Sequence, residues 1–124
     1  MTGPLDLIDL MQRAKALSGS YENVVLAEIN DHVIRISLMT QPYFWHLHPD
    51  SDETFIGLEG VVIIELAYAL TGDSKYHRVE LRPGQLFTVP TGVRHRTAPA
   101  HARSVNLTIE RAGIQTLRLD DPAT

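Results

Sequence analysis

HLHPDSDETFIGLEG, residues 46–60, places two histidines, a glutamate and a glycine within one short stretch of the chain. His46 and His48 stand one residue apart, Glu53 follows them, and Gly60 closes the segment. Residues i and i+2 of a β-strand point to the same face, and imidazole nitrogens bind divalent metals at about 2.0–2.1 Å. His46 and His48 can therefore converge on one metal ion if they lie on a strand. Alone, the pair has low specificity, because most such histidines are exposed or hydrogen-bonded side chains.

Glu53 extends the pattern, because the residues between it and His48, Pro-Asp-Ser-Asp, are typical of a turn. We therefore expect the next strand to fold back beside the first, with Glu53 at its start facing the histidines. A carboxylate among imidazoles lowers the net charge around a bound dication and suits iron, manganese, nickel or zinc. The alternative is that Glu53 only continues the acidic turn, as we expect of Asp50 and Asp52.

A further histidine, His95, ends the segment GQLFTVPTGVRH, residues 84–95. This segment opens at a Pro-Gly turn and contains a second turn around Pro90 and Gly92. If the chain is extended at His95, Thr97 shares its face. A single histidine after a loop carries little information, so the meaning of His95 depends on the rest of the pattern.

From about residue 22 the chain consists of short β-type runs separated by turn residues. Asn30-Asp31 is typical of a hairpin, and no second long helical pattern interrupts the runs. Many short strands with turns between them predict an all-β sandwich or barrel. The expected strands are residues 24–29, 32–39, 43–48, 54–58, 61–70, 77–82, 85–90, 95–98 and 104–110.

The N-terminal residues 4–17, PLDLIDLMQRAKAL, are expected to form one amphipathic helix. Pro4 suits the first helical position and Gly19 supplies a stop. Leu7, Met11 and Ala14 share one apolar face, which can pack on the outside of the β-domain or against a partner subunit. We therefore divide the chain into an N-terminal helix, residues 1–20, and a barrel domain, residues 21–124.

Composition narrows the function. A chain of 124 residues with 44% hydrophobic and 21% charged residues fits one globular domain. It has no cysteine, which excludes disulfides, thiolate metal sites and a cysteine nucleophile. The net charge of −4 argues against nucleic-acid binding, and no stretch reaches membrane-spanning length, so we expect a cytoplasmic protein. Five arginines could form an anion-binding patch, but we favour a rim of ion pairs: Arg78, Arg82, Arg94, Arg96 and Arg103.

Residues 46–60 and 84–95 together resemble the two motifs of the cupin family. The matching positions are His46, His48, Glu53 and Gly60 in the first motif and Gly84, Pro90, Gly92 and His95 in the second. The flanking segments are similar to small single-domain bacterial cupins, including those labelled mannose-6-phosphate isomerase-like, so the resemblance covers nearly the whole chain. Thr40 and Pro99 depart from the glycine and asparagine common in the family, but neither position is a metal ligand there.

The resemblance implies a cupin (RmlC-like) jelly-roll β-barrel with one N-terminal helix. It also implies a divalent transition metal (Fe, Mn, Ni or Zn) inside the barrel, held by His46, His48, Glu53 and His95. Four protein ligands leave open positions on an octahedral ion, so such a site is available for chemistry. Candidates for an apolar wall, or for plain core residues, are Phe44, Phe55 and Phe87.

Two functions stay open on this basis: a metal-dependent enzyme acting on a small molecule, by oxygenation or sugar isomerisation, and a non-catalytic cupin that binds a metal or small ligand. The sequence does not single out an acid–base residue among Tyr43, Tyr68, Tyr76 and Gln85. Asn106 either points inward or, as we favour, faces outward or bonds the backbone. Small cupins of this type are commonly dimers, and we expect a homodimer.

Overall fold

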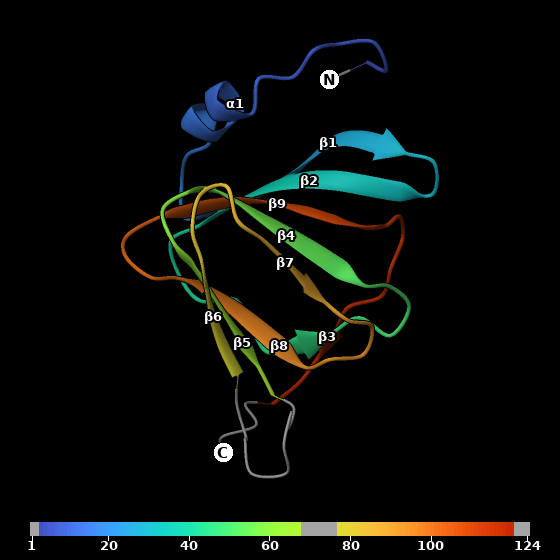
Figure 1. Cartoon of the computed structure of the whole chain (residues 1–124), viewed down its shortest axis with the longest axis vertical. Coiled ribbons are helices and arrows are strands. Elements are labelled where there is room, and N and C mark those ends of the chain that lie inside the picture. Colours follow the sequence, from blue (N-terminus) through green and yellow to red (C-terminus); the bar gives the residue numbers. More distant parts are fainter. Residues whose placement is uncertain (1–2, 68–76, 121–124) are drawn as a thin grey trace.

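The computed structural model describes residues 3–67 and 77–120, and two antiparallel sheets dominate it (Figure 1). The sheets face each other across the interior, which confirms the predicted all-β jelly roll. The first sheet has the order β1 (Tyr21–Ile29), β2 (His32–Met39), β9 (Ser104–Arg111), β4 (Glu53–Glu59) and β7 (Leu86–Val89). The second has the order β10 (Leu117–Arg118), β3 (His46–Leu47), β8 (His95–Pro99), β5 (Val62–Leu66) and β6 (His77–Leu81).

The hairpin between β1 and β2 forms where it is predicted. Ile29 pairs with His32, which leaves Asn30 and Asp31 as the two loop residues. Asn30 has a φ of 54°, a conformation that asparagine adopts more readily than most residues. The hairpin fixes the register of β1 on β2 next to the turn, and an irregularity between Val25 and Ala27 shifts it further along β1.

The prediction that the strand starting at Glu53 folds back beside the histidine strand is wrong. β4 pairs with β9 and β7 in the first sheet, whereas β3 pairs with β8 and β10 in the second. The turn after His48 thus carries the chain from one sheet to the other. β3 is also shorter than the predicted strand 43–48, and β5 covers part of the predicted strand 61–70, whose last three residues lie outside the described residues.

The N-terminal helix is shorter than predicted: α1 spans Leu10–Ala16 and not residues 4–17. Asp9 is its N-cap, and the Asp9 Oδ1 atom accepts a hydrogen bond of 3.1 Å from the Gln12 backbone N–H. The cap sets the start of the helix, so Leu7 lies before it and is fully exposed instead of extending the apolar stripe. Within the described residues, no helix is long and apolar enough to cross a lipid bilayer.

α1 packs on the outer face of the first sheet. Ala14 and Leu17 are buried in one cluster with apolar residues of β1, β2 and β9: Leu26, Ile36, Leu38, Val105 and Leu107.

Arg103 anchors the C-terminal end of the helix. Its two terminal nitrogens donate to the carbonyls of Ala14 (2.7 Å) and Leu17 (3.0 Å), and its Nε donates to Glu59 (2.6 Å).

The space between the sheets divides into an apolar part and a polar part. The apolar part is a cluster of buried side chains from both sheets: Met39, Phe55, Val62, Ile64, Leu66, Leu81 and Val89. The polar part lies beside it and contains the buried histidines and glutamates of the chain. The apolar cluster therefore forms one wall of the polar region, where the candidate site is built.

Candidate metal centre

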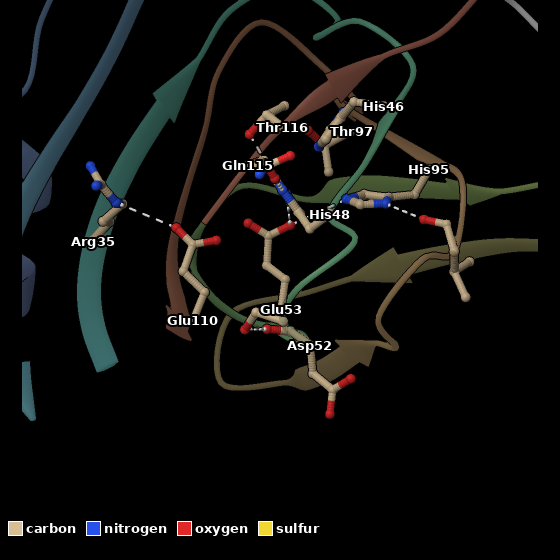
Figure 2. Close-up of polar contacts among 12 residues, drawn as sticks. Arg35, His46, His48, Asp52, Glu53, His95, Thr97, Glu110, Gln115 and Thr116 are labelled. Carbon is tan, nitrogen blue, oxygen red and sulfur yellow. Dashed lines mark hydrogen bonds and ion pairs between the residues drawn. The ribbon is translucent and has the colours of Figure 1, made fainter. Parts of the chain in front are cut away.

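The structure brings together the four side chains that the two motifs single out. His46 comes from β3, His48 follows that strand, His95 opens β8, and Glu53 opens β4 on the opposite sheet (Figure 2). One potential ligand atom from each residue lies within 4.8 Å of the others, and all four residues are buried. His46 and His95 are direct cross-strand partners in the second sheet, so their side chains share a face. The cluster is a group that could hold a metal ion.

Each histidine in the cluster has its Nδ1 atom against a backbone carbonyl. The contacts run from His46 to Phe44 O (2.8 Å), from His95 to Val93 O (2.8 Å) and from His48 to Gln115 O (2.9 Å). A carbonyl oxygen can only accept, so each Nδ1 must carry the proton and donate it. In a neutral imidazole the lone pair then belongs to Nε2. Metal-binding histidines in proteins are commonly held by such contacts.

The Nε2 atoms point toward the Glu53 carboxylate. Glu53 Oε1 lies 3.2 Å from Nε2 of His95 and 3.4 Å from Nε2 of His48. Two lone pairs facing a buried carboxylate repel unless a proton or a cation sits among them. His48 Nε2 is moreover a buried nitrogen without a hydrogen-bond partner among the described residues. A donor set of three imidazole nitrogens and one carboxylate, with this unsatisfied nitrogen, fits a divalent transition metal.

The electrostatics of His46 and Glu53 agree with this fit, whereas His48 retains a proton that a metal would have to displace. Burial and the neighbouring charge of His95 lower the pKa of His46 to about 4, so this ligand is neutral at neutral pH. Burial disfavours the charged form of His48, but the Glu53 carboxylate outweighs burial and raises the pKa of His48. Burial would raise the pKa of Glu53, yet the two adjacent imidazoles lower it well below its usual range. The carboxylate therefore remains ionised, as a metal ligand must be.

The cluster opens into a cavity of about 360 Å³ between the sheets. Of the three phenylalanines proposed for an apolar wall, Phe55 lines this cavity, whereas Phe87 packs on the apolar cluster. Phe44 stacks on Tyr43, and Tyr43 in turn meets His46 edge-on at 5.2 Å between ring centroids. Thr97 lines the cavity on the face of His95, as predicted.

The remaining histidines and acid–base candidates lie mostly elsewhere. His32, His77 and His101 are outside the cluster. Tyr43 lines the cavity, and burial raises its pKa, so its phenol stays protonated. Gln85 is exposed in a turn, where its side chain accepts from the Arg82 backbone N–H. Tyr68 and Tyr76 lie outside the described residues.

The cavity contains functional candidates that the sequence reasoning missed. Glu110 is 7% exposed, lines the cavity and forms an ion pair with Arg35 at 3.4 Å (Figure 2). Burial and the charge of Glu53 raise the pKa of Glu110 to about 7. Asn106, 1% exposed, lines the cavity and also donates to the backbone of Leu107, so both alternatives for it hold in part. The sequence signal that could have indicated these residues is the alternation along β9, in which Asn106, Thr108 and Glu110 share a face.

The comparisons with known proteins agree with this geometry. The family model described as Cupin domain matches residues 40–107. The protein YdbB of Bacillus subtilis (strain 168), itself described as uncharacterized, is 33% identical over 113 residues, which is 91% of this chain and 93% of YdbB.

Solved structures show the same fold. A cupin-2 domain containing protein from Shewanella frigidimarina NCIMB 400 has a TM-score of 0.69 and 25% identity, over 85% of this chain and 94% of that one. Hydroquinone 1,2-dioxygenase from Sphingomonas sp. TTNP3, with 4-hydroxybenzoate bound, has a TM-score of 0.68 and 18% identity, over 91% of this chain and 84% of that one. At 18% identity the likeness concerns the fold alone.

Proposed function

The chain belongs to the cupin domain family, and on that premise we propose that His46, His48, Glu53 and His95 bind a divalent transition metal (Fe, Mn, Ni or Zn) and present it to a small molecule. The cavity beside the four residues gives this molecule a place to bind. We propose that the protein is a metal-dependent enzyme. Cytoplasmic location, the absence of nucleic-acid partners and the division at residue 20 remain predictions from the sequence.

The observation that carries the proposal is the orientation of the three imidazoles. Because each Nδ1–H donates to a carbonyl, the Nε2 lone pairs are directed inward before any metal binds. A structural cluster of histidines would not need two Nε2 atoms against one buried carboxylate, with a potential ligand atom of the third histidine within 4.8 Å of them.

A bound cation would supply Lewis-acid or redox chemistry next to the cavity. The chain itself contributes the other parts of the site. Phe55 and the apolar cluster exclude water from one side, and the protonated Tyr43 phenol is available as a hydrogen-bond donor. Glu110 places a second carboxyl group in the same cavity. These groups give a small molecule a shaped and polar place beside the metal, which distinguishes the site from one that only stores metal.

Alanine substitutions test the metal centre. We expect His46→Ala, His48→Ala and His95→Ala each to lower metal affinity by more than about tenfold while the far-ultraviolet circular dichroism of the β-fold is kept. Elemental analysis of protein purified without a nickel column or chelator measures the occupancy. His101→Ala, an exposed histidine outside the cluster, is the matched control. Unchanged occupancy in all three cluster variants would refute the assignment.

Turnover assays then separate the kinds of activity. Oxygen uptake by iron-loaded protein with diols, phenols or thiols would indicate an oxygenase, and aldose–ketose interconversion would indicate an isomerase. Retention of a ligand without turnover would instead indicate the non-catalytic cupin.

A further inference from the structure

The cavity has a polar wall on the first sheet, facing the histidines of the second. Three alternate residues of β9, Asn106, Thr108 and Glu110, line it together with Arg35 and Ser37 of β2. In most two-sheet folds the inner faces are apolar and the outer faces polar. Here β2 and β9 are reversed, because their apolar residues lie under α1. A row of polar side chains in the interior is costly unless each finds a hydrogen-bond partner.

Glu110 is the charged member of this row nearest the metal centre. Its Oε1 atom pairs with Arg35 Nε at 3.4 Å, but its Oε2 atom is buried without a hydrogen-bond partner among the described residues. In Figure 2 the carboxyl group lies between Arg35 and Glu53. While both carboxyl groups are ionised, Glu53 is an acceptor as well and cannot satisfy this oxygen. Below the raised pKa of Glu110, a proton held between the two carboxyl groups can satisfy it. In the ionised state a donor from water or a ligand is required.

Asn106 repeats the pattern further along the strand. Its Nδ2 donates to the Leu107 carbonyl at 3.2 Å, while its Oδ1 atom is buried and also lacks a partner among the described residues. Four residues of strand, roughly 13 Å, separate Asn106 from Glu110. The unsatisfied groups at both ends of the row are thus acceptors, and a ligand with several donors can meet more than one of them.

Of the two arginines among the described lining residues, the one beside Glu110 is already engaged. Arg35 bonds Glu110 on one side and the Asn23 side chain (3.2 Å) on the other. Arg111 also lines the cavity, but it is exposed and follows the opposite alternation of β9 from Glu110. An anionic ligand at the Glu110 carboxylate would therefore find the adjacent cation, Arg35, already paired.

We infer that Glu110 Oε2 and Asn106 Oδ1 form an acceptor subsite that selects a small neutral or cationic molecule carrying hydroxyl or amino groups and disfavours carboxylates. This inference rests on the proposed function, since it names the ligand class of the same cavity. Glu110 is the specificity-determining residue, and Arg35 positions it.

Three six-carbon compounds with the same hydroxylated chain test the inference: glucamine (cationic), sorbitol (neutral) and gluconate (anionic). Their dissociation constants are measured by protein-detected NMR titration at pH 8.5, above the pKa of Glu110, in zinc-loaded and metal-free protein. In the metal-free protein, where no cation attracts the carboxylate, we expect gluconate to bind the wild type at least about tenfold more weakly than glucamine and sorbitol. Glu110→Gln should reduce the glucamine-to-gluconate preference by about tenfold, because a neutral amide replaces the carboxylate.

Two further variants sharpen the result. Arg35→Gln removes the positive charge beside Glu110, so the preference for glucamine should increase, opposite to Glu110→Gln. Glu80→Gln, an exposed glutamate paired with Arg78 and Arg82, should leave the preference unchanged. A metal-free wild type that prefers gluconate, or a preference in the metal-free protein that Glu110→Gln does not change, would overturn the inference.

Zinc occupancy, measured on the same samples, separates this inference from the proposed function. If the wild type binds no zinc, the metal centre fails while the preferences of the metal-free protein still decide the subsite. If Glu110→Gln lowers zinc occupancy, the metal-free titrations decide it in the same way.

Discussion

If the proposed metal binds, proton and metal compete for Nε2 of each clustered histidine, because Nδ1 already donates to a carbonyl. The pKa of His48 is raised above the ordinary histidine value of 6.5. Its Nε2 therefore keeps a proton to higher pH than an ordinary histidine does, and a metal must displace that proton. The pKa of His46 is lowered to about 4, so its Nε2 is free of protons down to that pH. Metal affinity should therefore decrease as the pH falls from 8 to 5.5, with a slope below three protons per metal.

A chelator-competition titration with zinc at several pH values measures this dependence. Metal affinity decreases as the pH falls because a protonated imidazole nitrogen cannot bind metal. An affinity independent of pH over this range would contradict imidazole ligation, and a slope of three would contradict the low pKa of His46.

Gly60 shows at the same scale why a motif can require glycine. Its φ is +67°, and a Cβ atom at this position would collide with the Arg103 carbonyl oxygen. Gly84 has a similar φ of +84° but open space around it. We expect Gly60→Ala to lower the free energy of unfolding by about 2 kcal/mol or more and Gly84→Ala by about 1 kcal/mol, measured by urea denaturation. Equal losses would show that strain alone, without the collision, explains the glycine.

The cluster of His46, His48, Glu53 and His95 could be predicted from the sequence, whereas the place of Glu110 beside it could not. His46, His48 and Glu53 are close in the chain, and the glycines around them limit the path of the backbone. Glu110 is recognisable only when the inner face of β9 is known. The alternation of SVNLTIE separates its two faces but does not say which one is inside.

At the scale of elements, the helix that covers the first sheet decides which face of β9 points into the interior. Val105 and Leu107 face outward because Ala14 and Leu17 of the helix region bury them. The amphipathic pattern before residue 20 was the signal, but the sequence left open whether it covers the barrel or a partner subunit. A sequence prediction that placed the helix on β9 would have assigned the apolar face of this strand to the outside and its polar face to the inside, the reverse of the usual arrangement.

Arg103 fixes this helix, and its substitution tests the element. Arg103→Ala removes the donors to the Ala14 and Leu17 carbonyls and the ion pair with Glu59. We expect a loss of about 1–3 kcal/mol in the free energy of unfolding, because charged hydrogen bonds at a helix end are involved. Arg78→Ala, an exposed residue with an ion pair of 3.8 Å, should change stability little. Thermal denaturation compares the two variants, and equal effects would contradict the anchoring role.

At the scale of the whole molecule, β1 is an edge strand of the first sheet with exposed apolar side chains. Val24, Val25 and Ile29 are 40%, 44% and 51% exposed. Edge strands of this kind readily pair with another chain. We therefore keep the prediction of a homodimer and assign this edge to it.

Light scattering should give twice the chain mass of 13.8 kDa for the wild type. Val25→Glu should yield the monomer mass, because it places a charge on the proposed interface. Leu86→Glu, which alters an exposed leucine on β7 at the other edge of the same sheet, is the control and should remain dimeric. A monomeric wild type would refute the assembly.

The carbonyl that orients His48 belongs to Gln115, which lies beyond the matched family region 40–107. The Asp50 carboxylate holds the Gln115 backbone N–H at 3.1 Å, and Thr116 Oγ1 lies 3.3 Å from the same imidazole. A shortened protein ending at Arg111 would thus retain every first-motif and second-motif residue and yet leave one imidazole free to rotate. If the proposed metal binds, the tail after the last long strand helps to position one of its ligands, and trimming the chain to a minimal barrel should weaken metal binding.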